Sequence, residues 1–454
     1  MRFSCLALGA LAAAGAAHAE EVVPSRLAGH AVLPALTLVV PPADAPRDAW
    51  ISGKFTGTAR NDQPYSAPAD TGAALGNRPT GLSLPFIGQP VQGFSGLALE
   101  RAPDGSFYVL TDNGFGTRRN SGDALLSFHR IAPDWDAGTV ERRETVFLRD
   151  PDRVVPFRIV NEATETRYLT GGDFDPESIQ VVGDSIWLGD EFGPFLIRAT
   201  LDGRVTGVFD TLLDGAPVRS PDNPALQVPA EAGTDWRSQR SGGYEGMALN
   251  PETGRLWALL EKPLVGEGGA PEGDFLRLLE FDPQVAAWTG ASLRFPLGEG
   301  ASAIGDINFI DATRALVIER DGGEGDPSLA CADPAAPAPD CFPVPARVKR
   351  IVLIDTANPA DDGTVSRIAS IDLMAIEDPD GNARLKTAAA AQLDRFTFPF
   401  QTIENVVRVD DTHILVVNDN NLPFSTGRQL DQAAANEFIL LDVPELLDAT
   451  LPPS

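Results

Sequence analysis

The sequence predicts an all-β protein built as a β-propeller, with five visible blades and a sixth expected. Three observations support this prediction: five segments share one hairpin pattern, a third apolar run follows each hairpin, and the units recur at intervals of roughly sixty to one hundred residues. Strand-rich units repeated along a chain are typical of propeller blades. A pair of β-sandwiches would also contain many short strands, but it does not predict five copies of one hairpin.

Each hairpin consists of two short apolar runs joined by a polar turn, which is the pattern of two antiparallel strands. The turns are PDG, VGD, PETG, DAT and VDD. The hairpins begin at Phe94, Pro176, Tyr244, Ile304 and Ile403. The third apolar runs begin at Leu125, Pro194, Phe275, Lys349 and Glu437. A fourth strand is expected in the more variable connections.

The N-terminal segment, which includes ISGKF from Ile51, is expected to supply a sixth blade or to complete a shared one. Four connections rich in Pro, Gly and Ala are interpreted as surface loops rather than domain linkers, because the repeat continues on both sides of each. They span residues 41–48, 213–234, 263–273 and 326–346. Residues 20–454 are therefore expected to form one domain, with the repeat core at about 93–445.

Residues 1–19 have the pattern of a secretory signal peptide: Arg2, a short apolar run, and the small-x-small signal Ala17-His18-Ala19. A membrane anchor is the alternative, but this run is about half the length of a span, and no other stretch is long and apolar enough. We expect cleavage near Ala19 and a periplasmic or secreted protein. In such an oxidising compartment, Cys331 and Cys341 are predicted to form a disulfide across a short loop.

The formal net charge of −28 disfavours nucleic acid and anionic lipid as partners. It is compatible with a protein that holds divalent cations, although solubility alone would also explain it. Zinc is disfavoured because His30, His129 and His413 show no ligand spacing. The sequence contains no G-x-S-x-G, P-loop or H-E-x-x-H motif, and Ser95 is interpreted as a repeat position rather than a nucleophile.

Two positions of the repeated hairpin carry acidic residues in most copies. The position just before the first strand holds Ser95, Glu177, Glu245, Gly305 and Glu404. The position at the end of the second strand holds Asp112, Glu191, Glu261, Glu319 and Asp419. The start of one strand and the end of the next lie at the same edge of an antiparallel hairpin. Radial repetition would therefore gather both sets, with the neighbouring Asp190, around one mouth of a central channel.

Carboxylates so close together repel one another and resist ionisation, and a hard cation with oxygen ligands removes this conflict. Calcium fits best because it accepts six to eight oxygens in irregular geometry. The predicted ligands are Asp112, Glu177, Asp190, Glu191, Glu245, Glu261, Glu319, Glu404 and Asp419. The alternative is that these acids are solvated turn residues, but Glu, which does not favour turns, fills six of the ten repeat positions.

Basic residues adjoin the predicted ring. Calcium together with Lys and Arg side chains would bind an anionic ester and polarise it toward attack by water. Glu245, Glu261, Lys262 and Arg320 are predicted to be catalytic, and Arg118, Arg119 and Arg428 to bind the substrate. An ordinary surface charge or ion pair is the alternative for each basic residue.

The chain resembles the phytase-like, esterase-like propeller family of exported bacterial proteins. The motifs that carry the resemblance are GFSGLAL…YVLTDNG, DPESI…WLGDEFGP, YEGMAL…LWALLE, IGDINF…VIERD and IENVV…VVNDNN, from about Phe94 to Arg428. The resemblance implies a calcium-containing propeller and a phosphoric-ester or carboxylic-ester hydrolase. By matching motif, it implies a role for Glu177, Asp190, Glu191, Glu245, Glu261, Glu319 and Glu404.

Two other functions remain open from the sequence. A non-catalytic propeller would bind a ligand or partner and use calcium only to stabilise the fold, because propellers host unrelated functions. A lactonase-like hydrolase of sugar esters would also suit an acidic, metal-bearing channel. Its neutral substrate would need no Lys or Arg clamp.

Overall fold

The computed structural model describes residues 20–226, 236–386 and 394–451. The predicted signal peptide and Cys5 lie outside these ranges. The described chain is dominated by β-strands, with one short α-helix, α1 (Pro444–Asp448), and four 3-10 helices, η1 (Arg47–Trp50), η2 (Ala73–Leu75), η3 (Glu267–Gly269) and η4 (Pro327–Leu329). The all-β prediction is therefore confirmed. None of the described helices has the length and apolar character needed to cross a membrane.

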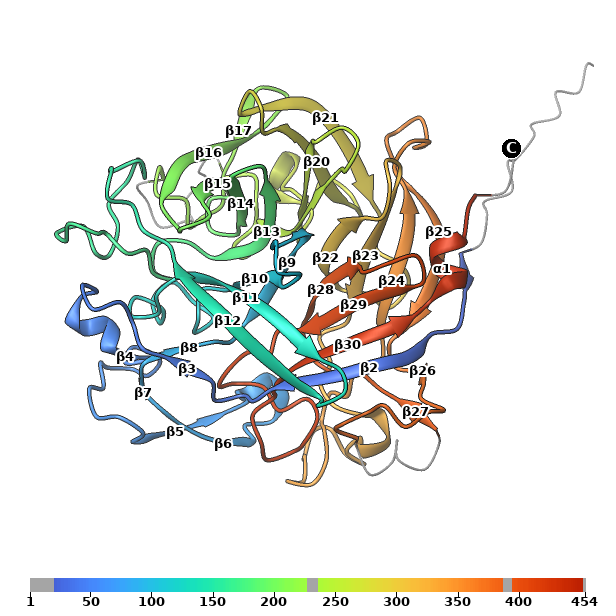
Figure 1. Cartoon of the computed structure of the whole chain (residues 1–454), viewed down its shortest axis with the longest axis horizontal. Helices are drawn as coiled ribbons and strands as arrows, with labels where there is room; N and C mark the ends of the chain where they lie inside the picture. The colour runs from blue at the N-terminus through green and yellow to red at the C-terminus, as the bar shows by residue number, and fades with distance from the viewer. Residues whose placement is uncertain (1–19, 227–235, 387–393, 452–454) are drawn as a thin grey trace, which may run out of the picture.

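Five antiparallel sheet units follow one another along the chain (Figure 1). The first unit contains β9 (Phe94–Arg101), β10 (Phe107–Thr111), β11 (Ser127–Asp134) and β12 (Thr139–Phe147). The second contains β13 (Pro176–Val182), β14 (Ser185–Asp190), β15 (Phe195–Thr200), β16 (Val205–Leu213) and the short β17 (Ala216–Val218). The third contains β18 (Tyr244–Leu249), β19 (Leu256–Leu260), β20 (Leu276–Asp282) and β21 (Ala287–Phe295). The last two contain β22 (Ala303–Phe309), β23 (Arg314–Arg320), β24 (Lys349–Asp355) and β25 (Ser366–Asp372); and β28 (Ile403–Arg408), β29 (His413–Asn418) and β30 (Asn436–Asp442). The predicted hairpins are the first two strands of each unit.

The first strands of the five units form a closed ring. Each packs against the first strand of the next unit, and β28 packs against β9. The backbones approach so closely that a Cβ on Gly246 would lie 2.8 Å from the Ile307 amide nitrogen, and one on Gly305 would lie 1.8 Å from the Ile403 carbonyl oxygen. Only glycine fits at such positions. The sheets therefore radiate from a common centre, in a propeller-like arrangement.

The N-terminal segment completes the last unit instead of forming another. Strand β2 (Arg26–Leu33) pairs antiparallel with β30, so the first long strand supplies the fourth strand of the final sheet. Strand β1 (Glu21–Val22) adds in parallel to β25. The ISGKF sequence contains the short β4 (Ile51–Ser52), which among the described strands forms a two-stranded sheet with β7 (Phe86–Ile87). The segment was expected either to supply a sixth blade or to complete a shared one, and the pairing of β2 with β30 agrees with the second expectation.

Short strand pairs lie outside the five units. They are β3 (Leu38–Val39) with β8 (Gln89–Pro90), β5 (Ala67–Asp70) with β6 (Pro79–Leu84), and β26 (Ile376–Glu377) with β27 (Arg395–Phe396). The segment that contains β3 to β8 packs its own apolar residues, among them Leu84 and Phe86, against Phe115 in the β10–β11 loop. This contact holds the N-terminal segment beside the loops at one end of the ring.

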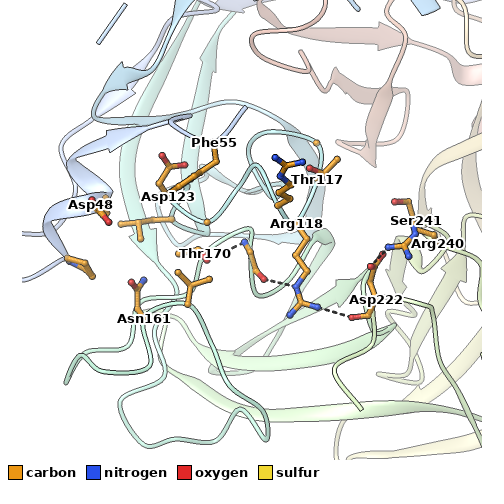
Figure 2. A pocket seen from close by; sticks show the side chains of 18 residues that line it. Asp48, Phe55, Thr117, Arg118, Asp123, Asn161, Thr170, Asp222, Arg240 and Ser241 are labelled. Carbon is orange, nitrogen blue, oxygen red and sulfur yellow. Dashed lines mark hydrogen bonds and ion pairs between the residues drawn. The ribbon is translucent and has the colours of Figure 1, made fainter. Parts of the chain in front are cut away.

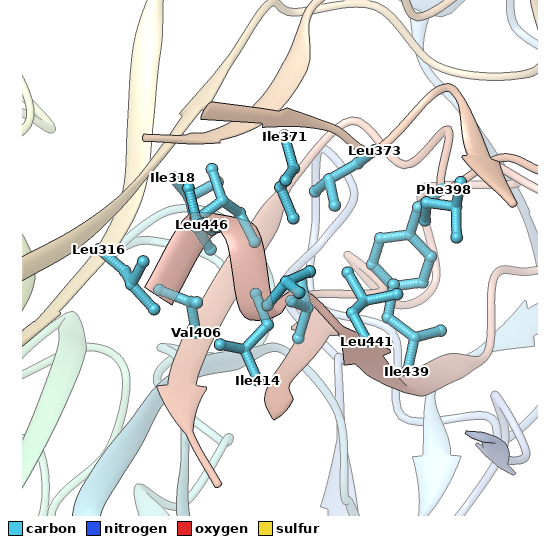
Figure 3. Packing of buried hydrophobic residues seen from close by; sticks show 14 of the residues in the cluster. Leu316, Ile318, Ile371, Leu373, Phe398, Val406, Ile414, Ile439, Leu441 and Leu446 are labelled. Atoms are coloured by element: carbon cyan, nitrogen blue, oxygen red, sulfur yellow. The ribbon is translucent and has the colours of Figure 1, made fainter. Parts of the chain in front are cut away.

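Apolar side chains fill the spaces between neighbouring sheets. The largest cluster lies between the fourth and fifth units and is covered by α1 (Figure 3). Leu316 and Ile318 on β23 face Val406 and Ile414 across this layer, with Leu446 of α1 over it. Burial of such side chains is the main force that holds the sheets together, at roughly 1.5–3 kcal/mol for each.

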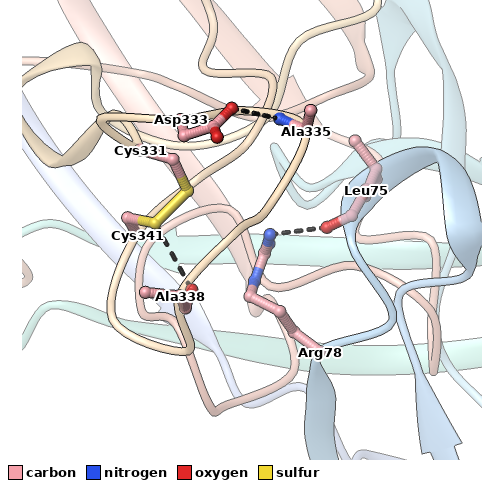
Figure 4. The surroundings of a disulfide bond; sticks show 7 residues. All are labelled: Leu75, Arg78, Cys331, Asp333, Ala335, Ala338 and Cys341. Atoms are coloured by element: carbon pink, nitrogen blue, oxygen red, sulfur yellow. Dashed lines mark hydrogen bonds between the residues drawn. A yellow bond between two sulfur atoms is a disulfide. The ribbon is translucent and has the colours of Figure 1, made fainter.

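The predicted disulfide is present. Cys331 and Cys341 are bonded, with their Cα atoms 4.8 Å apart, at the base of a Pro-rich loop (Figure 4). Nearby, the Arg78 guanidinium donates a 2.6 Å hydrogen bond to the Leu75 carbonyl and pairs with Glu324. These contacts join the disulfide loop region to the N-terminal segment.

Candidate functional site

The ends of the second strands meet around the centre of the ring. In each hairpin one residue near the strand end pairs across to the first strand; the pairs include Asp190 with Pro176 and Asn418 with Ile403. The residue that follows each paired position turns toward the centre. These residues are Asp112, Glu191, Glu261, Arg320 and Asp419.

A cavity of about 200 Å³ lies at this point, and we call it the acidic cavity. Eight carboxylates line it: Asp112, Asp175, Glu177, Glu191, Glu245, Glu261, Glu404 and Asp419. Two cationic side chains, Lys262 and Arg320, line it as well. Among the described lining residues, carboxyl groups therefore outnumber cationic side chains by six. The structure thus brings together seven of the nine predicted metal ligands and all four predicted catalytic residues.

Burial and mutual repulsion disfavour the ionised carboxylates. Burial first, and then the neighbouring Glu261 carboxylate, raises the pKa of Glu245 to about 8, although Arg320 lies beside it. Burial also raises the pKa of Asp175 and of Asp419 to about 6. Burial followed by nearby carboxylates raises the pKa well above its ordinary value at Asp112, Glu177, Glu191 and Glu404. A site of this kind takes up either protons or cations.

Arg320 is the central cation of the cavity. Its Nη2 atom lies 3.0 Å from Glu245, 3.4 Å from Glu404 and 3.7 Å from Glu261. Although burial opposes the charged form, these carboxylates raise the pKa of the guanidinium. Arg320 thereby offsets part of the repulsion among three carboxylates that come from two sheet units, Glu245 and Glu261 from the third and Glu404 from the fifth.

Lys262 is held at the edge of the cavity. Its ammonium group lies 3.0 Å from Glu261 and also donates to the Ser241 carbonyl. Ser241 has a backbone φ of 44°, a left-handed conformation that is uncommon for serine. Such conformations persist where surrounding contacts impose them, and they concentrate at functional sites.

The residues present fit a divalent metal ion. One ligand oxygen from each of Glu191, Glu245 and Glu261 can be chosen so that all lie within 4.8 Å of one another. Asp175 Oδ1 is buried in the cavity wall without a hydrogen-bond donor, while Asn113 binds its other oxygen at 2.7 Å. Buried carboxylate oxygens that outnumber their donors are the ligands of hard cations such as calcium.

Two predicted ligands lie outside the acidic cavity, and the strand register explains why. Glu319 pairs with Ile304 as Asp190 pairs with Pro176, one residue before the position that faces the centre. A shift of one residue turns a side chain to the opposite face of a strand. Glu319 instead contacts two arginines, Arg350 and Arg367, and Asp190 accepts the amide N–H groups of Asp175 and Gly193. We therefore remove Glu319 and Asp190 from the predicted metal set.

The prediction that Arg428 binds the substrate is also corrected. Its guanidinium is buried in a two-point pair with Glu437, at 3.1 and 2.7 Å, and donates to the Thr397 carbonyl. Glu437 also contacts His30 of β2, at 3.1 Å. Arg428 therefore acts in closing the fifth sheet unit and does not line the acidic cavity.

Arg118 and Arg119 line a second cavity of about 780 Å³, which we call the outer chamber (Figure 2). Gly116 and Ser241 line both cavities, so the two adjoin. The walls of the outer chamber come from the segment that contains η1 and β4, the β10–β11 and β12–β13 loops, and the loop before β18. The β10–β11 loop thus supplies Asp112 to the acidic cavity and Arg118 and Arg119 to the outer chamber.

The sequence prediction missed Asp175. This residue lies two positions before Glu177 in DFDPES, outside the repeat positions that the alignment compared. The Asp-Pro-Glu sequence could have indicated it, because an acid two residues before a repeat carboxylate lies at the same end of the strand. Thr402 and Asn421, which contact Asp419 through its carboxylate oxygens, likewise line the cavity.

Comparison with known proteins gives one family. A family model described as phytase-like, with the esterase-like activity of phytase, matches residues 89–422. No curated protein matches the chain.

Similar solved structures include a glutaminyl cyclase from Myxococcus xanthus, with 11% identity over 83% of this chain and 94% of that one and a TM-score of 0.34. A putative 6-phosphogluconolactonase from Bacteroides uniformis has 13% identity over 75% and 67% of the two chains and a TM-score of 0.30. An aldose sugar dehydrogenase from Streptomyces coelicolor has 12% identity over 83% and 97% and a TM-score of 0.33. These similarities are too distant to indicate a function.

Proposed function

We propose a function from the fact that this chain belongs to the phytase-like family. It is a calcium-dependent hydrolase of a phosphate ester or another ester, and it acts at the acidic cavity. The observation that carries the proposal is the excess of six carboxyl groups over cationic side chains, most of these carboxyl groups being buried, in a cavity of about 200 Å³. Carboxylates with raised pKa values in a cavity are typical of functional sites. We further propose that the five sheet units are the blades of one propeller domain and that the protein is exported.

Glu191, Glu245 and Glu261 would hold the ion, with Asp175 and Glu177 on the adjoining wall. A bound calcium ion supplies Lewis acidity to the ester and lowers the pKa of a water nucleophile. The protein itself would orient the substrate. Once a cation neutralises their carboxylate partners, Arg320 and Lys262 are the groups positioned to donate hydrogen bonds to anionic oxygens of the ester.

The test is a calcium titration of the mature protein after a chelator has removed its bound metal. Melting temperature and hydrolysis of 4-nitrophenyl phosphate, 4-nitrophenyl acetate and a neutral lactone are measured together. We expect calcium to raise the melting temperature and the turnover of one substrate. Glu245→Gln should remove both effects. Glu319→Gln is the matched control, since it changes the same residue type on a neighbouring strand end outside the cavity and should retain the calcium response.

Each alternative has its own outcome. A rise in melting temperature with no hydrolysis would support the non-catalytic propeller in which calcium is structural. Hydrolysis of the lactone alone would support the lactonase-like enzyme. Turnover that persists in metal-free Glu245→Gln protein would overturn the proposal, as would a protein on which calcium has no effect.

A further inference from the structure

The outer chamber differs from the acidic cavity in its charge. Its walls carry three carboxylates, Asp48, Asp123 and Asp222, and each already has a cationic partner within the described chain. Arg60 binds Asp48 through two hydrogen bonds of 2.7 and 3.1 Å, and Lys54 lies 3.2 Å from Asp123. The third carboxylate is paired with Arg240.

Two guanidinium groups on the chamber wall form no direct ion pair with a carboxylate of the described chain. Arg118 donates to two backbone carbonyls, those of Gly172 at 2.8 Å and Asp222 at 2.9 Å (Figure 2). These bonds fix its position without neutralising its charge. Arg119 is exposed on the same wall, and the described residues offer it neither an ion pair nor a hydrogen bond. The chamber therefore has positive charge available beside an acidic cavity.

The remaining walls are largely apolar. Ala49 and Phe55 come from the N-terminal segment, Leu125 from the end of the β10–β11 loop, and Val160 from the β12–β13 loop. Val160 is 51% exposed, which is high for a large aliphatic side chain that lines a cavity. A volume of about 780 Å³ lies in the range of small-molecule sites, which combine apolar walls with few polar groups.

We propose that the outer chamber binds the part of the ester that is not attacked, and that this part has an apolar body and a carboxylate or phosphate recognised by Arg119. The inference rests on the proposed function, because it takes the acidic cavity as the place where the ester bond lies. Because Gly116 and Ser241 line both cavities, one molecule can occupy the two together. Guanidinium groups bind carboxylate and phosphate through paired hydrogen bonds, which Arg119 would donate. The positive charge of the neighbouring Arg118 would add to the attraction.

The experiment compares esters that differ only at the remote end. The probes are the phosphate and acetate esters of 2-naphthol and of 6-hydroxy-2-naphthoic acid, each assayed with calcium-loaded protein. For whichever ester type is hydrolysed, we expect kcat/KM to be at least about tenfold higher for the carboxylated probe, since a hydrogen bond to a charged group is of that strength. Arg119→Gln should reduce this preference about tenfold. Arg395→Gln, an exposed arginine on β27, should leave rate and preference unchanged.

A binding measurement separates this inference from the proposed function. Fluorescence titration with 6-hydroxy-2-naphthoate should show a Kd about tenfold higher for Arg119→Gln than for wild type. If esters are hydrolysed without preference, or the preference survives Arg119→Gln, the inference fails while the hydrolase stands. If no ester is hydrolysed but naphthoate binding depends on Arg119, the chamber's ligand class is supported and the hydrolase fails. Binding that is independent of Arg119 overturns the inference.

Discussion

Replacing Arg320 with Gln should destabilise the metal-free protein much more than the calcium-loaded protein. The guanidinium lies within 3.7 Å of Glu245, Glu261 and Glu404, and its residue is only 9% exposed. Its removal leaves the buried Glu245 and Glu404 without their nearest cation and leaves Glu261 with Lys262 alone. Breaking a buried ion pair in this way costs about 3–5 kcal/mol.

The magnitude can be converted to a melting temperature. For the roughly 435 residues after the predicted cleavage, the unfolding entropy is about 0.9 kcal/mol/K. A loss of about 3–5 kcal/mol therefore lowers the melting temperature by about 3–6 °C in chelator. Calcium carries two positive charges, so a saturated site should recover more than half of this loss. Calcium should also bind Arg320→Gln more tightly, because the variant no longer places a positive charge beside the ion.

The assay is differential scanning fluorimetry in chelator and in saturating calcium, with calorimetry for the calcium Kd. Arg395→Gln serves as the exposed control and should change neither quantity. Equal losses of melting temperature with and without calcium would refute the reasoning. So would weaker calcium binding by Arg320→Gln, because the guanidinium and the ion would then not share the same carboxylates.

Three further predictions concern residues outside the acidic cavity. Glu319→Gln should lower the melting temperature equally in chelator and calcium and leave the calcium Kd unchanged; a tenfold rise in Kd would return Glu319 to the ligand set. Burial raises the pKa of Glu437, but Arg428 and His30 outweigh it and the pKa falls to about 2. The stability from this group is present above its unfolded pKa of about 4.3 and is lost as pH falls toward 2, about 3 kcal/mol in total. Urea unfolding of wild type between pH 5 and 2 should show this loss and Glu437→Gln should not, whereas equal slopes would contradict it. Replacing Cys331 and Cys341 together with Ser should reduce the unfolding free energy by up to about 3 kcal/mol, since the closed loop is short. Calcium binding should be retained, and a large loss of affinity would show that the disulfide loop shapes the site.

The repeated hairpins were predictable because strand alternation and turn residues are local properties of a chain. Matched copies of one local unit also indicate radial symmetry, which explains why Glu177, Glu245 and Glu404 were expected together and lie on one cavity. The Cys331–Cys341 disulfide was predictable for a similar reason, since few residues separate the two thiols.

Register was harder to predict than repetition. An acid near a strand end faces the centre at Glu261 but not at Glu319, and the two differ by a single step along the strand. A sequence pattern locates a strand end only to within a residue or two, while the direction of a side chain changes at every residue. The inward position in the fourth unit therefore belongs to Arg320.

The sequence by itself determined the all-β class, the repeated unit and the gathering of carboxylates at one mouth, because each of these follows from neighbours along the chain. Only the tertiary structure decided which charges meet. It pairs Arg320 with Glu245 and β2 with β30, contacts between segments far apart in the sequence, and among the described residues it leaves Arg119 without an ion pair on a cavity wall. Whether a charged side chain is paired or available depends on partners that are distant in sequence, and packing alone brings those partners together.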